Sequence, residues 1–241
     1  MGLISITSLV INSDGDIFAG TRLDGIFRST DNGNNWTEVG MTNFSINTFA
    51  INANGNIFAG TFNSGIFRSS DNGDSWTEQN NGLTSTRVNS FAFNSDSDVF
   101  AGTDNGIFRS MDNGNSWSVS SSGLPSASSI LALEINSGGD IFAGTEESGV
   151  YRSTDNGSSW TEINMGLTDY SVNSLAAYSN SSIFAGTESG VFWSVNNGDS
   201  WTEVNMGLTN TQIKSLIINS DGVIFAGTNG SGVFRGIETT F

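Results

Sequence analysis

A pentapeptide of the form Ile/Val-Phe-Ala-Gly-Thr recurs six times along this 241-residue chain. Its phenylalanines are Phe18, Phe58, Phe100, Phe142, Phe184 and Phe225. They are separated by 40, 42, 42, 42 and 41 residues, a regularity that indicates a tandem-repeat protein. This periodicity constrains the fold more than any other feature, because each repeat must be one small unit that buries its apolar faces against its neighbours.

Each repeat contains four short segments that favour β-strands. In the second repeat they are residues 46–52, 56–61, 65–69 and 76–78, separated by Asn-Gly, Asn-Ser-Gly and Asp-Asn-Gly turns. No segment shows an apolar stripe with helical spacing. Because a four-stranded unit cannot bury both faces alone, six units in a closed ring are the natural solution. We therefore predict an all-β, six-bladed β-propeller with four antiparallel strands per blade.

The predicted propeller is a single domain over residues 1–241. Its approximate blades are residues 1–40, 41–81, 82–123, 124–166, 167–207 and 208–241. The last repeat ends at Ile237–Phe241 without the turn and tryptophan of the other repeats, so we expect this segment to form an atypical outer strand.

Composition excludes several classes of function. With 8 Lys and Arg against 24 Asp and Glu, the net charge of −16 disfavours nucleic acid and anionic membranes as partners. The chain has no Cys and no His, so it lacks disulfides, thiolate nucleophiles and imidazole bases. We predict no metal and no cofactor, and we expect a soluble monomer. No signal peptide or transmembrane stretch is present, so the sequence leaves localisation open.

Five repeats share a further motif, Ser-x-Asp-x-Gly-x-x-Trp. The copies are Ser29–Trp36, Ser69–Trp76, Ser110–Trp117, Ser153–Trp160 and Ser194–Trp201, the last with Asn196 in place of Asp. This motif resembles the Asp-box of BNR-repeat propellers, a group that includes sialidases, sortilin-type receptors, xyloglucan-cleaving glycosidases and photosystem assembly factors. The resemblance covers nearly the whole chain, and we expect a non-catalytic member of that group. It also favours a secreted or cell-surface protein.

The motif residues have a structural interpretation. Asp accepts backbone hydrogen bonds across its turn, Gly permits positive φ and Trp pins the hairpin. These structural residues are Asp31, Trp36, Asp71, Trp76, Asp112, Trp117, Asp155, Trp160 and Trp201. Calcium binding by the four aspartates is an alternative. Two further sets of charged residues recur at equivalent positions of the repeats, and we call such a set a column. The arginine column could form cross-strand ion pairs with the glutamate column; the arginines are at 28, 68, 109, 152 and 235, and the glutamates at 38, 78, 162 and 203.

Catalysis finds little support in the residues. The resemblance to sialidases would require an Arg-Ile-Pro motif, whereas the only proline, Pro125, follows Leu124. Five of the seven arginines belong to the repeated column, which leaves only Arg22 and Arg87 as irregular ones. A glycosidase needs two suitably placed carboxyl groups, one with a raised pKa. Glu134 is the one acid that replaces an apolar inner-strand residue of the other repeats.

Variation between the repeats is concentrated in the loops of one face. Phe44 and Tyr170 occupy matching positions between repeats and could flank the mouth of the propeller to stack on sugars; alternatively, both rings anchor their loops. A polar column at the start of the innermost strands includes Asn47, Asn89, Asn173 and Lys214. We predict a non-enzymatic scaffold or binding module for a protein or carbohydrate ligand. The alternatives are a glycan-binding lectin and, third, a glycosidase-like enzyme.

Overall fold

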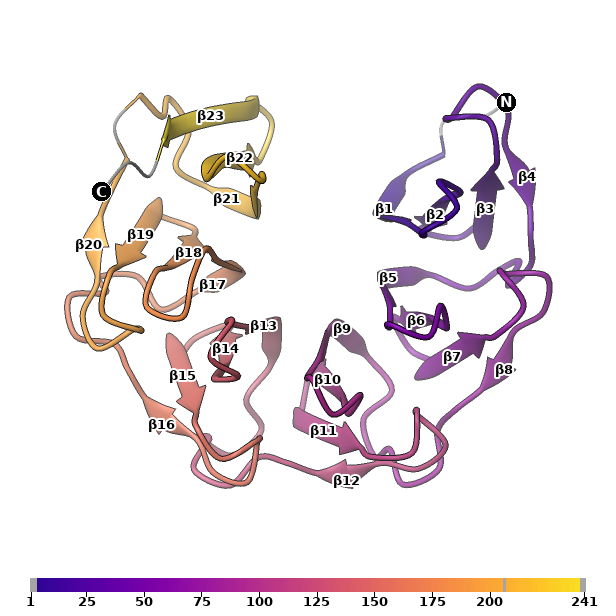
Figure 1. Cartoon of the computed structure of the whole chain (residues 1–241), viewed down its shortest axis with the longest axis horizontal. Coiled ribbons are helices and arrows are strands. Elements are labelled where there is room, and N and C mark those ends of the chain that lie inside the picture. Colours follow the sequence, from indigo (N-terminus) through magenta and orange to yellow (C-terminus); the bar gives the residue numbers. More distant parts are fainter. Residues whose placement is uncertain (1–3, 206, 239–241) are drawn as a thin grey trace. The chain divides into compact units, whose positions relative to one another are not determined.

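The structure of the protein is a computed structural model that describes residues 4–205 and 207–238. These residues form 23 β-strands in six antiparallel sheets, the blades (Figure 1). Within the described ranges, no helix has the length and apolar character needed to cross a membrane. The chain forms two compact units, each of which is described by itself. The first contains the residues up to Asp104 together with Phe108–Val119, and the second contains Asn105–Ile107 and the residues from Ser120 onward.

The first unit holds the first two blades and most of the third. The first blade comprises β1 (Ile6–Ile11), β2 (Ile17–Thr21), β3 (Ile26–Ser29) and β4 (Thr37–Glu38). The second comprises β5 (Ile46–Ile51), β6 (Ile57–Thr61), β7 (Ile66–Ser69) and β8 (Thr77–Glu78). The third comprises β9 (Val88–Phe93), β10 (Val99–Thr103), β11 (Gly106–Ser110) and β12 (Ser118–Val119), and the division between the units passes through β11.

The second unit holds the remaining three blades. The fourth blade comprises β13 (Ile130–Ile135), β14 (Ile141–Thr145), β15 (Val150–Ser153) and β16 (Thr161–Glu162). The fifth comprises β17 (Val172–Ala177), β18 (Ile183–Thr187), β19 (Val191–Ser194) and β20 (Thr202–Glu203). The sixth comprises β21 (Ile213–Ile218), β22 (Val223–Thr228) and β23 (Gly232–Glu238).

Five blades confirm the predicted four-stranded meander. The second blade runs β5-β6-β7-β8, and the observed ends of its strands lie within one residue of the predicted ones. The sixth blade differs. Its sheet has three strands, and Ile237 and Glu238 continue β23 instead of starting an outer strand. The predicted outer strand at Ile237–Phe241 is therefore wrong for its first two residues, because β22 still pairs with this segment at Val223↔Glu238; residues 239–241 lie outside the described residues.

The apolar core lies between adjacent blades, as stacking of incomplete units requires. In the first unit, Phe18 and Ile26 of the first blade pack against Ile46 and Phe49 of the second. Equivalent clusters join the second and third, fourth and fifth, and fifth and sixth blades. The pentapeptide explains why these faces fit. A Cβ on Gly60 would lie only 2.8 Å from Val88 Cγ1 of the next blade, so a side chain there would push the inner strands apart.

Candidate functional site

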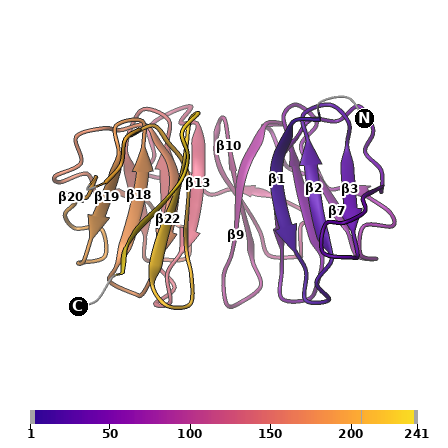
Figure 2. The same ribbon diagram turned by 90° about the horizontal axis from the view of Figure 1, so that it is seen from above.

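Each unit has two different ends (Figure 2). The turn end carries the octapeptide turns, meaning the Ser-x-Asp-x-Gly-x-x-Trp segments, together with the hairpins between the first and second strands. The two features meet there, since Asn72 Nδ2 of an octapeptide turn donates to Asp16 Oδ2 of a hairpin at 2.7 Å. The loop end carries the loops between second and third strands and the connections between blades. Phe62 N donates to Ser45 O at 2.9 Å and joins these two kinds of loop.

The aspartate of each octapeptide turn is satisfied inside its own turn. Asp71 Oδ1 accepts hydrogen bonds from the Ser69 hydroxyl at 2.8 Å and the Ser75 amide at 2.9 Å, while Oδ2 accepts from the Ser75 hydroxyl at 2.6 Å. The Ser75 hydroxyl is the largest of the influences that lower the pKa of Asp71 to about 2. Gly73 has φ +84° and Asn72 has φ +58°, the left-handed conformation that this turn needs. The geometry supports the structural interpretation of the motif.

Four of the five octapeptide tryptophans link their blade to the one before it, whereas Trp36 of the first blade donates to Gly33 O of its own turn at 3.0 Å. Within the first unit, Trp76 Nε1 donates to Val39 O at 3.2 Å and Trp117 Nε1 donates to Gln79 O at 2.9 Å. In the second unit, Trp201 Nε1 donates to Ile163 O at 2.7 Å. Each of these four indoles therefore combines apolar burial with a satisfied N–H in the joint between blades.

The hypothesis of cross-strand ion pairs between the arginine and glutamate columns is wrong. The register pairs Arg28 with Thr37 and Phe27 with Glu38, so the arginine and the glutamate are not opposite each other. Arg28 Nη1 reaches instead to the octapeptide turn of the next blade, where it contacts Asp74 Oδ1 at 2.9 Å.

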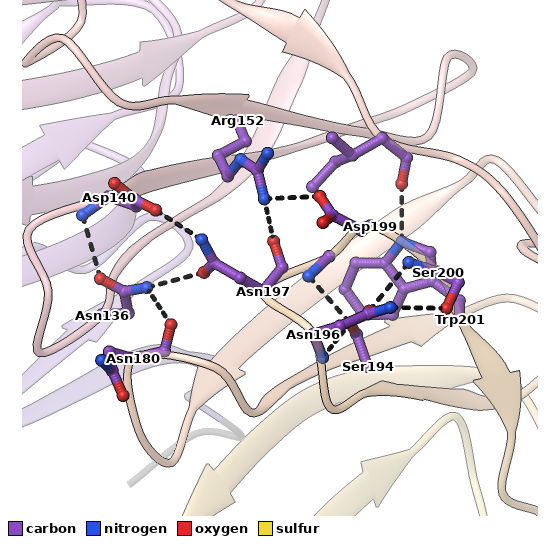
Figure 3. A network of polar contacts seen from close by, with 12 residues as sticks. Asn136, Asp140, Arg152, Asn180, Ser194, Asn196, Asn197, Asp199, Ser200 and Trp201 are labelled. Carbon is purple, nitrogen blue, oxygen red and sulfur yellow. Dashed lines mark hydrogen bonds and ion pairs between the residues drawn. The ribbon is translucent and has the colours of Figure 1, made fainter.

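The fourth and fifth blades show this clamp in full (Figure 3). Arg152 Nη1 donates to Asn197 O at 2.5 Å and to Asp199 Oδ1 at 2.9 Å. The Asn197 side chain accepts from Asn136 Nδ2 at 2.9 Å and donates to Asp140 Oδ2 at 2.5 Å. These three side chains of the fourth blade thus hold both the backbone and the side-chain amide of the turn that follows.

The fifth blade has lost the same clamp residues. Trp193 stands in the arginine column and Tyr178 stands where the earlier blades have the hairpin asparagine. Trp193 stacks on Phe184 with an interplanar angle of 3° and donates to Ser182 Oγ at 2.8 Å. Phe184 is nevertheless only 3 % exposed, although the sixth blade has no octapeptide turn to cover it. An aromatic stack here takes the place of the next blade's turn.

The predicted polar column lies in a β-bulge at the loop end of every innermost strand. In the second blade Ile46 pairs with Thr61 and Thr48 pairs with Gly60, so Asn47 is the extra residue. The same irregularity contains Thr7, Asn89, Leu131, Asn173 and Lys214.

Two asparagines of this column tie neighbouring blades together. Asn47 Nδ2 donates to Val88 O at 3.2 Å, and Asn173 Nδ2 donates to Ile213 O at 2.8 Å. The other two predicted residues contact loop carboxylates: Asn89 Nδ2 lies 3.0 Å from Asp104 Oδ1, and Lys214 Nζ lies 2.5 Å from Glu188 Oε1. These contacts give the column a structural role, and ligand binding by it stays a prediction.

The two aromatic residues proposed for sugar stacking have different environments. Phe44 is half-buried and packs edge-to-face on Phe67, with ring centroids 5.1 Å apart, as a loop anchor would. Tyr170 keeps 48 % of its surface exposed, while its backbone oxygen accepts from Gly149 N at 2.9 Å. Phe44 lies in the first unit and Tyr170 in the second, so each is considered separately.

Sequence reasoning missed a cluster at the loop end of the first unit. The Arg87 guanidinium carbon lies 4.4 Å from the centroid of the Phe62 ring, and Arg87 Nη1 lies 3.3 Å from Asp104 Oδ2. Phe62 remains 47 % exposed. In the sequence, Arg87 lies outside the repeated arginine column, and Phe62 and Asp104 lie in variable loops. Nothing in the sequence shows that these three residues meet.

Glu134, the candidate catalytic acid, lies in a joint between blades. Its carboxylate accepts a hydrogen bond from the Ala177 amide of the next blade at 3.1 Å. Burial raises the pKa of Glu134 to about 7, and the Ala177 amide partly opposes this shift. No charged group contributes to the shift, so this raised pKa does not come from a paired carboxylate. Among the described residues, no three acidic side chains are grouped so that they could hold a metal ion.

The antiparallel blades and their repeated joints define the chain as a β-propeller. Residues 84–222, more than half of the chain, match the DUF6242 beta propeller domain, and the protein belongs to this family. A search of curated proteins found no match.

Solved structures agree on the fold. The extracellular domain of BT4673 from B. thetaiotaomicron has a TM-score of 0.70 at 17% identity, over 98% of this chain and 38% of that chain. YCF48 bound to D1 peptide has a TM-score of 0.76 at 14% identity, over 97% of this chain and 79% of that chain. An ancestral GH74 enzyme has a TM-score of 0.80 at 19% identity, over 98% and 38%. The chain thus spans less than two fifths of the BT4673 extracellular domain, and at these identities the likeness concerns the fold alone.

Proposed function

We propose that this protein is a non-enzymatic β-propeller binding module that recognises its ligand at the loop end. The observation that carries the proposal is the contrast between the two ends. At the turn end, the same side chains make the same hydrogen bonds in blade after blade. At the loop end, the first residue after the second strand changes its chemistry from blade to blade. These residues are Arg22, Phe62, Asp104, Glu146, Glu188 and Asn229.

We further propose that the octapeptide turns are Asp-boxes and that the protein is a non-catalytic relative of BNR-repeat propellers. The hydrogen bonds of the Asp31, Asp71, Asp112 and Asp155 carboxylates within their turns support this assignment. Asn196 keeps part of the pattern, because its Oδ1 accepts from the Ser200 amide at 3.0 Å. Both oxygens of each of these four carboxylates accept a hydrogen bond within the turn, which favours a structural role for them.

The absence of catalysis is part of the proposal. Glu134 has the raised pKa that an acid catalyst needs, but its carboxylate binds the backbone of the neighbouring blade. The chemistry of glycosidases requires a second carboxyl group placed across the substrate. No charged group contributes to the shift of the Glu134 pKa, which favours a structural role for this residue.

A protein or peptide is the preferred ligand, and a glycan is the second candidate. The exposed Phe62 ring beside Arg87 combines apolar area with a charge, as protein-binding surfaces do. The propeller YCF48 has been solved with a bound D1 peptide, which shows that a similar fold accommodates a peptide. Tyr170 supports the glycan alternative, since it is an exposed ring in a loop next to Asp169. The net charge of −16 argues against nucleic acid and anionic membranes.

Peptide and glycan arrays probed with the labelled protein test this function. A loop-end variant, Phe62→Ala, is compared with a turn-end variant, Thr154→Ala, whose exposed side chain lies in an octapeptide turn. We expect ligands whose binding is lost in the first variant and kept in the second. Binding lost equally in both variants, or hydrolysis of an arrayed glycan, would contradict the proposal.

A further inference from the structure

Two cationic side chains at the loop end of the first unit differ in their use from the arginines at positions 28, 68, 109 and 152. The arginine column at positions 28, 68, 109 and 152 is committed to interactions at the turn end. Arg22 and Arg87 lie at the loop end of the first unit, in a chain with three times as many acidic as basic residues. Neither of them takes part in the clamps of the turn end.

Arg22 has an exposed side chain that makes no hydrogen bond or ion pair with the described residues. Its neighbour Leu23 is 66 % exposed. An arginine that no structural contact uses, beside an exposed apolar side chain, can pair with a ligand carboxylate without breaking an existing bond.

Arg87 is held ready for a similar contact. Its side chain is 45 % exposed, and its guanidinium lies over the Phe62 ring at 4.4 Å. Stacking on a ring restricts the guanidinium to one plane and leaves its edges available for hydrogen bonds. The ion pair with Asp104 is long, at 3.3 Å, and both partners are solvent-exposed, so it holds the arginine only weakly.

The repeat places these groups in one row. Phe62 N donates to Ser45 O just as Asp104 N donates to Arg87 O and Arg22 N donates to Ser5 O. Ser45 and Arg87 therefore occupy equivalent positions at the entry to the second and third blades. Arg22 and Phe62 are likewise equivalent, because each is the loop residue of the blade that precedes that entry. Along adjacent blades the loop end presents a cation, a hydroxyl, a ring and a second cation.

We propose that this row binds an acidic peptide, with its carboxylates on Arg22 and Arg87 and an apolar side chain on Phe62 and Leu23. This inference rests on the proposed function and adds the chemistry of the ligand. A peptide fits better than an acidic sugar, because two exposed apolar side chains accompany the cations. Charge complementarity between the two cations and the carboxylates of the peptide is local to this row and supplies selectivity, whereas the net charge of −16 slows the long-range approach of an acidic ligand.

The test uses fluorescent heptapeptides in which Asp and Glu alternate with Leu and Phe, and a matched set with Asn and Gln. Affinities are measured by anisotropy for the whole protein and for Arg22→Gln, Arg87→Gln and Arg235→Gln. The last variant is the matched control, because it removes an exposed arginine of β23 in the second unit, outside this row. Loss of a charge-assisted hydrogen bond predicts about tenfold weaker binding for each arginine variant and an unchanged affinity for the control.

Three results would overturn the inference: equal binding of the neutral peptides, equal weakening by Arg235→Gln, or binding of sialylated or uronic acid oligosaccharides at this row in preference to peptides. Thermal unfolding of each variant shows whether it is folded. If the acidic peptides fail while another ligand binds in a manner sensitive to Phe62→Ala, only this inference falls. If no ligand depends on the loop end, the proposed function falls with it.

Discussion

Replacement of Glu134 by alanine should stabilise the protein at neutral pH and leave it almost unchanged in mild acid. The other five blades carry an apolar residue in this column, so an apolar side chain fits the joint; these residues are Val10, Ala50, Ala92, Ala176 and Ile217. Burial raises the pKa of Glu134 from its ordinary value of 4.5 to about 7. Because one pKa unit corresponds to about 1.4 kcal/mol, holding the ionised carboxylate in the folded protein costs roughly 3 kcal/mol.

The pH range follows from the sign of this shift. A raised pKa means that the folded protein binds the proton more tightly than the unfolded chain does. The favourable contribution of protonated Glu134 is thus complete below pH 4.5 and is lost as the pH rises to about 7. The octapeptide aspartates act in a different range, because the lowered pKa of Asp71 makes its contribution fall only as the pH drops below 3.8 toward 2.

Urea unfolding followed by tryptophan fluorescence at about pH 5 and about pH 8 measures this effect. The unfolding free energy of the variant should exceed that of the unchanged protein by up to about 3 kcal/mol at the higher pH, with most of this difference gone at the lower pH. Glu134→Gln serves as a control that keeps the shape and an acceptor for the Ala177 amide. A difference between the proteins that is the same at both pH values would refute the reasoning.

Three further predictions concern the scaffold. Arg152→Gln should lower the unfolding free energy by about 1–2 kcal/mol in urea titrations, whereas Glu162→Gln should change it by less than about 0.5 kcal/mol. Equal losses in the two variants would support an ion pair between Arg152 and Glu162, which the register excludes. Gly60→Ala should cost about 1–3 kcal/mol by thermal unfolding, because its methyl group would enter the next blade, and an unchanged melting temperature would contradict this fit. Ser75→Ala should raise the pKa of Asp71 in a carboxyl NMR titration, since it removes the largest cause of the lowered value, and an unmoved titration would show that the hydroxyl is not that cause.

The replaced clamp of the fifth blade illustrates how the structure explains sequence exceptions. Arg152 and Asn136 hold an octapeptide turn that exists in the fifth blade. The sixth blade has no such turn, and in the fifth blade Trp193 and Tyr178 stand at the two positions that would have held it. The replacement of the arginine and the asparagine in the fifth blade therefore accompanies the loss of the octapeptide turn in the sixth blade, and the two differences form one structural change.

Much of the fold was predictable because the same strand-forming segments recur in all six repeats. The pentapeptide spacing, the turn dipeptides and the strand-forming segments placed the strands of the second blade within one residue. The sixth blade was less predictable, because Ile237 and Glu238 have no counterpart in the other repeats. Local pattern could not tell whether they turn back or extend β23.

The candidate site could be predicted only in part. Comparison of the repeats identified the variable end and the irregular Arg87, since both are departures from a period. It did not identify the contact between Arg87 and Phe62, because this contact depends on how a loop of one blade meets the entry to the next. The assignment of the arginine column failed for a related reason. The sequence showed two recurring charges of opposite sign, but their register is offset by one residue.

The sequence by itself determined the strands, the turns and the number of blades, because these depend on interactions within about 41 residues that the chain repeats. Only the tertiary structure decided the partners of individual side chains. Arg152 finds its acceptors 45 and 47 residues away, and Glu134 acquires its raised pKa from burial next to Ala177. Such contacts and such burial arise when two blades stack. The periodic pattern specifies the strands and turns of each blade, but it does not specify which atoms of neighbouring blades come into contact.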